Sequence, residues 1–253
     1  MSFANDALIS NQFLGGKLDV WQPKKGYRAG ADPVFLAAAV PATSGQSVLE
    51  LGCGAGVASL CLGRRVAGLV QFGVEVQEDY AELARRNSAE NGIKLHVETC
   101  DLRELPALVR DQVFDQVFAN PPYFKRSHGT DAADSGRKKA LAGDTPLTDW
   151  VEIATRRLKP GGYMTMIQKA DRLPDVFRAF DHRLGGVVVR PLAPRSGKEV
   201  DIVIIQAQKG ARGPMRLLAP FILHEGDNHQ GDRDSYTVAA RQILRGGAAL
   251  EIC

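Results

Sequence analysis

The sequence has few cysteines, and they lie far apart. The chain of 253 residues has four of them, and none shows the close pairing that zinc ligands need. No cluster combines them with histidines. We therefore predict no metal site and interpret all four as reduced thiols: Cys53, Cys61, Cys100 and Cys253.

Long hydrophobic runs are also missing. No stretch approaches the roughly 18 apolar residues that a bilayer span requires. The first residues, MSFANDALISNQF, lack the basic head and apolar run of a secretory signal. We expect a cytoplasmic protein with no membrane partner.

A large excess of charge of one sign is absent too. Lys and Arg total 32 and Asp and Glu 29, which gives a net charge of +3. This balance excludes a histone-like or acidic-tail protein, although it permits an anionic partner. With 44% apolar and 24% charged residues, the chain has the composition of an ordinary globular protein with a core.

Apolar, β-branched runs alternate along the chain with segments of helical period. This alternation predicts an α/β fold in which helices cover both faces of a parallel sheet. The later part predicts a helix over 171–182 and an antiparallel hairpin of 187–192 with 200–208 at the end of the sheet. The other predicted strands are 48–51, 70–76, 94–98, 113–119 and 163–168, and the other predicted helices are 32–40, 57–66, 77–91 and 147–158, the last stopped by a turn at 159–162.

No repeat or linker separates two domains. We therefore expect one domain with decorated ends. Residues 1–47 would form an N-terminal lid, residues 48–210 the domain itself, and residues 211–253 an extension packed on it.

A glycine-rich loop follows the first of these runs. Gly52, Gly54 and Gly56 lie between a predicted strand and a predicted helix, where an α/β sheet leaves a crevice at its carboxyl edge. Glycine lets the backbone approach a ligand closely. Tight strand–helix packing without a ligand is the alternative.

Acidic residues end the next two predicted strands. Glu75 lies about 20 residues beyond the loop, the distance at which a carboxylate meets ribose hydroxyls in nucleotide sites. A solvated glutamate at a strand end is the alternative. Asp101 suits the exocyclic amine of an adenine, or it caps a helix that starts at Leu102.

Two nucleotides fit such a crevice, a dinucleotide and S-adenosylmethionine. Dinucleotide sites space their glycines as G-x-G-x-x-G, whereas this loop is G-x-G-x-G preceded by Glu50. A carboxylate near the ligand suits a cationic amino acid better than a diphosphate. The sequence has no G-x-x-x-x-G-K-[ST], which disfavours a nucleoside triphosphatase. S-adenosyl-L-methionine is the better match.

The motif Asn120-Pro121-Pro122-Tyr123 directly follows another predicted strand and faces the same crevice. Two prolines remove two N–H donors, so carbonyls and the Asn side chain remain as acceptors. Acceptors can hold both N–H groups of a planar amine, and Tyr123 can stack on a flat substrate. A proline-rich turn that merely ends a strand is the alternative.

Taken in order, these motifs resemble the class I S-adenosylmethionine-dependent methyltransferases that modify amino groups. Residues 22–32 (QPKKGYRAGAD), 120–124 (NPPYF) and 158–162 (LKPGG) are similar to the bacterial valine-tRNA adenine-N6-methyltransferase family. The resemblance covers about residues 14–208. It implies a seven-stranded Rossmann-like sheet, mostly parallel with a C-terminal antiparallel hairpin, and methyl transfer to the 6-amino group of an adenine in tRNA.

The resemblance also implies site residues. The catalytic residues would be Asn120, Pro121, Pro122 and Tyr123. The cofactor-binding residues would be Tyr27, Arg28, Asp32, Glu50, Gly52, Cys53, Gly54, Gly56, Glu75, Val76, Asp101, Leu102 and Asn120.

A basic segment follows the N-P-P-Y motif. Residues 125–139 hold five basic and two acidic residues, which RNA phosphates would favour. A solvated loop is the alternative. The substrate-binding residues that we expect are Tyr123, Phe124, Lys125, Arg126, Lys138 and Lys139.

Two other functions remain open. One is a protein glutamine N-methyltransferase that acts on a release factor or ribosomal protein, because the glutamine amide of such a substrate would also present a planar amino group to the N-P-P-Y motif. Those enzymes, however, carry a larger helical domain before the glycine loop. A catalytically idle cofactor-binding or RNA-binding module is the other, but it would have no need for the amine-accepting motif.

Overall fold

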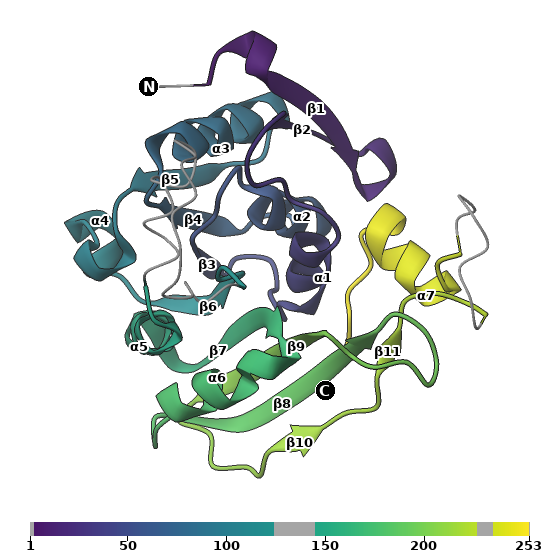
Figure 1. Cartoon of the computed structure of the whole chain (residues 1–253). Helices are drawn as coiled ribbons and strands as arrows, with labels where there is room; N and C mark the ends of the chain where they lie inside the picture. Colours follow the sequence, from purple (N-terminus) through teal and green to yellow (C-terminus); the bar gives the residue numbers. More distant parts are fainter. Residues whose placement is uncertain (1–2, 124–144, 227–234, 253) are drawn as a thin grey trace, which may run out of the picture.

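In the computed structural model of this protein, the residues described are 3–123, 145–226 and 235–252. Within them, nine strands form one sheet in the order β10-β8-β9-β7-β6-β3-β4-β5, and β11 also pairs with β8 (Figure 1). The strands are β3 (Ser47–Leu51), β4 (Val70–Glu75), β5 (Leu95–Thr99), β6 (Phe114–Ala119), β7 (Leu158–Lys169), β8 (Leu184–Ala193), β9 (Ile202–Lys209), β10 (Arg216–Leu217) and β11 (Phe221–Ile222).

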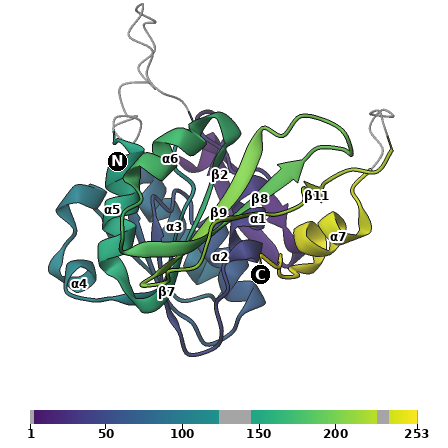
Figure 2. The same cartoon turned by 90° about the horizontal axis from the view of Figure 1, so that it is seen from below.

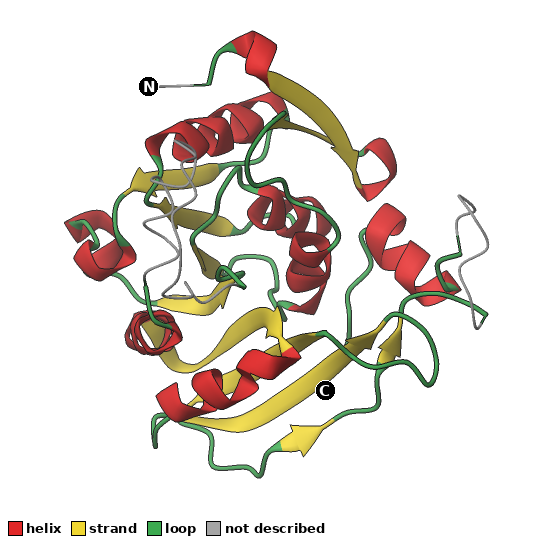
Figure 3. Ribbon diagram, viewed as in Figure 1, coloured by secondary structure: helices red, strands yellow, loops and turns green. Residues whose placement is uncertain are grey.

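Helices cover both faces of this sheet (Figures 1 and 3). Along β3, Val48 joins the core cluster of α1 and α2, whereas Leu49 joins that of α4, α5 and α6. Along β6, Phe118 and Val117 divide in the same way, because successive side chains of a strand point to opposite faces. The α-helices are α1 (Asp32–Ala39), α2 (Val57–Arg65), α3 (Glu78–Glu90), α4 (Ala107–Arg110), α5 (Leu147–Arg157), α6 (Leu173–Ala179) and α7 (Val238–Arg241).

The direction of the strands places the site. β3 pairs in parallel with β4 and β6, β4 with β5, and β6 with β7. The carboxyl ends of these strands therefore meet at one edge of the sheet. β9 runs antiparallel between β7 and β8, so the expected mostly parallel sheet with a C-terminal antiparallel hairpin is confirmed.

The seven strands expected from the sequence are all present, with ends shifted by a few residues. The turn expected at 159–162 is wrong, because β7 already begins at Leu158 and runs through Pro160. Its pairing with β6 is irregular there, with a register shift between Phe114 and Gln116. The ammonium of Lys159 bonds the Asp115 carboxylate at 2.8 Å across the two strands, which holds this segment to the sheet.

The N-terminal segment contains a hairpin that the sequence did not lead us to expect. β1 (Leu8–Phe13) pairs antiparallel with β2 (Leu18–Pro23) in a sheet of its own. The hairpin packs on α3, where the Asn87 side chain accepts a hydrogen bond from Trp21 N (2.8 Å) and donates one to Trp21 O (3.0 Å). Part of the expected lid is therefore a structured element on the body of the protein.

The C-terminal segment begins along β8, at the end of the sheet opposite β5. β10 and β11 pair in parallel with β8. α7 lies at the end of the molecule opposite α4 and α5 in both views (Figures 1 and 2). Leu250 N then donates to Ala38 O of α1 at 2.8 Å, so the chain returns to the first helix.

Three further observations concern the part of the chain that the structure describes. No helix in it is long and apolar enough to cross a membrane. Cys53, Cys61 and Cys100 are free thiols, and Cys253 lies outside the described residues. No three His, Cys, Asp or Glu side chains within these ranges gather in a way that could hold a metal ion.

Candidate active site

The three loop glycines all have positive φ angles, but they differ in what a side chain at each position would meet. A Cβ on Gly52 (φ +66°) would lie 2.6 Å from the indole ring of Trp150, and one on Gly56 (φ +84°) would lie 3.3 Å from the Cβ of Ala84. A Cβ on Gly54 (φ +54°) would meet no atom within 4 Å. Gly52 and Gly56 therefore admit neighbouring elements, whereas Gly54 faces open space in which a ligand can approach the backbone.

Glu75 ties this loop to the end of β4. Its Oε2 accepts from Gly54 N and its Oε1 from Gln77 N, both at 2.9 Å. Burial raises the pKa of Glu75, and the two backbone hydrogen bonds oppose that rise. Each carboxylate oxygen has a further lone pair, so the side chain can still accept from hydroxyl groups of a ligand.

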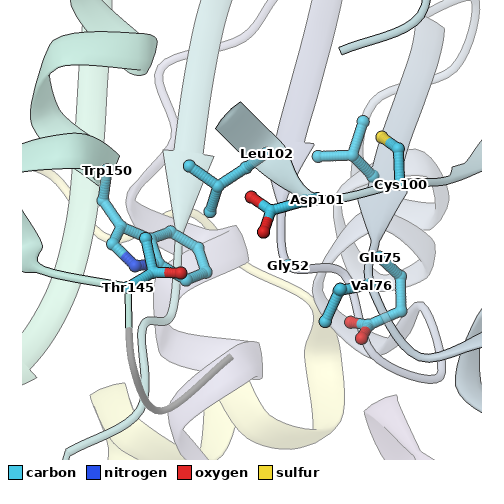
Figure 4. Close-up of a pocket in the computed structure, with 9 residues that line it drawn as sticks. Gly52, Glu75, Val76, Cys100, Asp101, Leu102, Thr145 and Trp150 are labelled. Carbon is cyan, nitrogen blue, oxygen red and sulfur yellow. The ribbon is translucent and has the colours of Figure 1, made fainter. Parts of the chain in front are cut away.

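A first hollow, with about 330 Å³ of space that is partly open to solvent, lies over the ends of β3, β4 and β5. In Figure 4, Trp150 and Thr145 stand on one side of it, and Glu75 and Val76 stand on the other. Carboxylates and apolar side chains together form a wall that suits a nucleoside, with polar groups for the ribose and a flat apolar slot for the base. Its lining is completed by Gly52, Val74, Cys100, Asp101 and Leu102.

Asp101 fulfils the capping role expected as one alternative and also lines this hollow. Its Oδ1 accepts from Arg103 N at 2.9 Å, which caps the short helical turn that starts at Leu102. The Arg103 guanidinium pairs with the carboxylate at 2.6 Å and, through this hydrogen bond, lowers the pKa of Asp101. The side chain therefore stays ionised and presents acceptor oxygens at the rim of the hollow.

A second hollow, with about 410 Å³ of space that is partly open to solvent, shares Gly52 of the glycine loop with the first. The N-terminal segment forms one wall of it and Asn120 forms another. Its remaining lining includes several residues that we expected from the sequence and several that we did not: Gln22, Tyr27, Ala29, Pro33, Glu50, Cys53, Gly54, Ala55, Val57, Ala58 and Tyr80.

Glu50 is buried beneath this second hollow, with 3% of its surface exposed. Its Oε2 accepts from both the hydroxyl and the backbone N–H of Ser59 in α2. Burial raises the pKa of Glu50 to about 8, against the effect of the Ser59 hydrogen bonds. The carboxylate thus anchors the glycine loop to α2 at the place where we expected it to face a cationic amino acid.

Tyr27 connects the N-terminal segment to the motif at the end of β6. Its carbonyl accepts from the Tyr80 hydroxyl at 3.0 Å, and its own hydroxyl accepts from Asn120 Nδ2 at 3.4 Å. Although 57% of Tyr27 is exposed, burial of its hydroxyl end, with the charges of Asp32 and Glu50, raises its pKa to about 12. Because the carboxamide nitrogen of Asn120 points to Tyr27, its oxygen remains available as an acceptor.

The other predicted residues of the lid and the motif have definite places. Tyr123 is half-buried and its hydroxyl donates to Asp32 at 2.6 Å. Pro121 is buried and Pro122 exposed. Arg28 is exposed and donates to the Asn11 side chain at 3.1 Å. Neither Arg28 nor Asp32 lines either of the two hollows.

The substrate-binding residues expected after Tyr123 lie outside the described residues. They are Phe124, Lys125, Arg126, Lys138 and Lys139.

Sequence reasoning missed part of both linings. Trp150 is the largest omission, because its contact with Gly52 depends on how α5 packs and not on a local motif. Tyr80 and Gln22 gave more signal: Tyr80 lies in the first turn of the helix that follows Glu75, and Gln22 begins the segment QPKKGY.

The pair of adjoining hollows fits S-adenosylmethionine. The first hollow suits a nucleoside. The backbone at Gly54 is open to a ligand, and the second hollow, which Gly54 and the Glu50 carboxyl group line, suits the amino-acid part. Residues 42–186, more than half of the chain, match the family model described as a methyltransferase domain. Fold, site and match together define a class I S-adenosylmethionine-dependent methyltransferase.

A curated relative narrows this class. The chain is 32% identical over 239 residues to a tRNA1(Val) (adenine(37)-N6)-methyltransferase of Porphyromonas gingivalis, a match that covers 81% of this chain and 92% of the relative. The chain belongs to the family of that enzyme. It is therefore an N-methyltransferase.

Solved structures agree with the fold. A crystal structure from Agrobacterium tumefaciens, described as a predicted O-methyltransferase, superposes with a TM-score of 0.69 at 23% identity, covering 87% of this chain and 98% of the other. A 16S rRNA N2 G1207 methyltransferase of Thermus thermophilus, in complex with AdoMet and guanosine, gives a TM-score of 0.54 at 21% identity, covering 80% and 50%. At these identities the likeness concerns the fold alone.

Proposed function

We propose that this chain methylates the 6-amino group of an adenine in tRNA. The observation that carries the proposal is the position of Asn120 in the wall of the second hollow, beside the glycine loop, with its nitrogen held by Tyr27. The carboxamide oxygen, which accepts from no other described residue, is then an acceptor for an amine next to the cofactor. The name of the relative from Porphyromonas gingivalis supports adenine in tRNA as the substrate.

S-adenosylmethionine supplies, when bound, a methyl group on a sulfonium that an amine nitrogen can attack. The part of the protein is to hold the amine. Asn120 Oδ1 and the second lone pair of the Pro121 carbonyl, which already accepts from Gln168, each accept one N–H, which favours a geometry in which the nitrogen lone pair points at the methyl group. Hydrogen bonds aimed at charge that develops in a transition state contribute about 3 kcal/mol each in comparable sites.

Tyr123 supports a flat substrate. Tyr123 follows Asn120 by three residues in the same motif. A base turned out of an RNA fold commonly stacks on an aromatic side chain. We further propose that residues 1–47 form an N-terminal lid segment over the site, of which the β1–β2 hairpin and α1 are the fixed parts, that residues 211–253 are an extension of the domain 48–210, and that the enzyme acts in the cytoplasm. The basic residues after Tyr123 stay a prediction.

The test uses the purified chain with S-adenosylmethionine labelled in its methyl group. Separate reactions contain total tRNA, ribosomal RNA, DNA and a release factor, and the methylated nucleoside or amino acid is identified by mass spectrometry. We expect N6-methyladenosine in tRNA. Label in a glutamine of the release factor would instead establish the protein methyltransferase, and label in neither would contradict both.

The variant Asn120→Ala tests the acceptor role of this side chain. Loss of one acceptor should reduce transfer by about 100-fold or more. The affinity for S-adenosylhomocysteine, measured by calorimetry, should change by less than threefold, because this side chain forms only part of one wall. A parallel loss of affinity would remove Asn120 from the amine site and assign it to the cofactor.

A further inference from the structure

Two backbone carbonyls of the N-P-P-Y motif are held from the end of β7. Gln168 is fully buried, and its Nε2 donates to Pro121 O at 3.4 Å. The guanidinium of Arg172 donates to Tyr123 O at 3.3 Å. These contacts fix the path of the backbone, but they leave the side chain of Tyr123 free to rotate about its own bonds.

The N-terminal segment holds the side chains of the same motif. Asn120 Nδ2 donates to the Tyr27 hydroxyl at 3.4 Å, and the Tyr123 hydroxyl donates to Asp32 Oδ2 at 2.6 Å. The second bond is much the shorter, and its acceptor is a carboxylate. Hydrogen bonds to an ionised acceptor are about twice as strong as bonds between neutral groups.

The proton of the Tyr123 hydroxyl stays with the ring. Burial and the charge of Asp32 raise the pKa of Tyr123 well above its usual range. The hydroxyl is therefore a donor throughout the physiological pH range, and its one proton is engaged by Asp32. The face of the ring, not the hydroxyl proton, is what remains for a substrate.

Asp32 itself stands on a rigid support. It is the first residue of α1, and the residues from Pro33 to Val40 are all buried. The last turn of that helix is held by Gln206 Nε2, which donates to Ala39 O at 3.2 Å, and by Leu250 N, which donates to Ala38 O at 2.8 Å. A side chain on such an element can fix another residue accurately.

We propose that Asp32 is a positioning residue that holds the ring of Tyr123 in the orientation needed to stack on the target base. The inference rests on the proposed function for the identity of that base. Asp32 acts through Tyr123 and not on the cofactor, since it lines neither of the two hollows.

The experiment compares Asp32→Ala, Asp32→Asn, Tyr123→Phe and the double variant of Asp32→Ala with Tyr123→Phe. We measure the single-turnover rate at saturating tRNA, the tRNA concentration for half-saturation, and the affinity for S-adenosylhomocysteine. Asp32→Ala and Tyr123→Phe should each lower the rate, or raise the half-saturating concentration, by about 10-fold. The affinity for S-adenosylhomocysteine should stay within about twofold of wild type.

The double variant and the conservative variant identify the mechanism. Because both single changes remove the same bond, the double variant should be no worse than the poorer single variant. Asp32→Asn should recover most of the rate, since a carboxamide oxygen also accepts from the hydroxyl. Multiplying effects in the double variant, or an Asp32→Asn variant as poor as Asp32→Ala, would overturn the proposal.

Asp201→Ala is the matched control. Asp201 lies at the same edge, pairs with Lys169 at 3.3 Å, and adds negative charge near Tyr123 without bonding its hydroxyl. If Asp32→Ala acted only by changing the charge that RNA meets, Asp201→Ala would reproduce its effect. We expect it not to do so.

A substrate-free measurement separates this inference from the proposed function. Wild type, Asp32→Ala, Tyr123→Phe and the double variant are unfolded in urea, and a coupling between Asp32 and Tyr123 in the free energy of unfolding is expected. Additive changes would overturn the positioning contact whatever the substrate. A wild-type chain that methylates no RNA would overturn the proposed function and the stacking role with it, while a coupled pair would retain the contact.

Discussion

The hydroxyl of Ser59 lies 2.5 Å from Oε2 of Glu50, and the backbone N–H of Ser59 donates to the same oxygen at 3.0 Å. Even so, burial raises the pKa of Glu50 to about 8 from its ordinary 4.5. Near neutral pH the folded chain therefore keeps a proton on this carboxyl group, whereas the unfolded chain has released it. The glycine loop is therefore anchored by a carboxyl group that, near neutral pH, is neutral in the folded chain and charged in the unfolded chain.

This difference gives a pH dependence of stability. Between pH 4.5 and 8 the folded state binds more protons at Glu50, so the free energy of unfolding should fall as the pH rises, by about 1 kcal/mol per pH unit. Glu50→Gln retains an acceptor for Ser59 but has no proton to lose, and its unfolding free energy should decline less. Urea unfolding at pH 5, 6.5 and 8 compares the two proteins, and parallel slopes would contradict the assignment.

Gly54→Ala should separate stability from cofactor binding. Gly54 and Gly45 both have positive φ, and a Cβ on either would meet no atom within 4 Å. Alanine in that region costs about 1 kcal/mol, so both variants should lose similar stability. Only Gly54 lines a hollow, and its methyl group should lower the affinity for S-adenosylhomocysteine by about 10-fold or more. Calorimetry would refute this if Gly45→Ala weakened binding equally.

Glu75→Gln should weaken cofactor binding. An amide nitrogen cannot accept from Gly54 N or Gln77 N, so one of these backbone donors would lose its partner. The acceptor for the ribose would be impaired at the same time, and we expect about a 10-fold loss in the affinity for S-adenosylhomocysteine. Glu98→Gln on the neighbouring strand β5 is the control. Unchanged affinity in Glu75→Gln would exclude this carboxylate from the ribose site.

The sheet could be predicted because its strands and helices have clear periods. β10 and β11 could not, since two residues, such as Arg216 and Leu217, give no periodic signal. Their pairing with β8 depends on tertiary contacts. The β1–β2 hairpin did leave a signal, the pair Gly15-Gly16 between two runs, which the expectation of a lid over residues 1–47 did not include.

The features of the site also fall into two groups, those with a local sequence signal and those without one. The glycine loop, Glu75 and Asn120 belong to local motifs, and the structure brings all three to the two hollows. The contacts that join separate segments carried no signal. Tyr123 and Asp32 are 91 positions apart, and only the packing of α1 against the sheet makes them neighbours.

The return of the chain to α1 links its far end to the place where chemistry occurs. The backbone N–H of Leu250 donates to Ala38 O near the C-terminal end of α1, and Ile252 is buried. Asp32, which accepts from the Tyr123 hydroxyl, lies at the N-terminal end of the same helix. Removing the residues from Leu250 onward, or fusing a bulky tag that keeps Ile252 from its buried position, would thus shift α1 and with it the position of the Tyr123 ring.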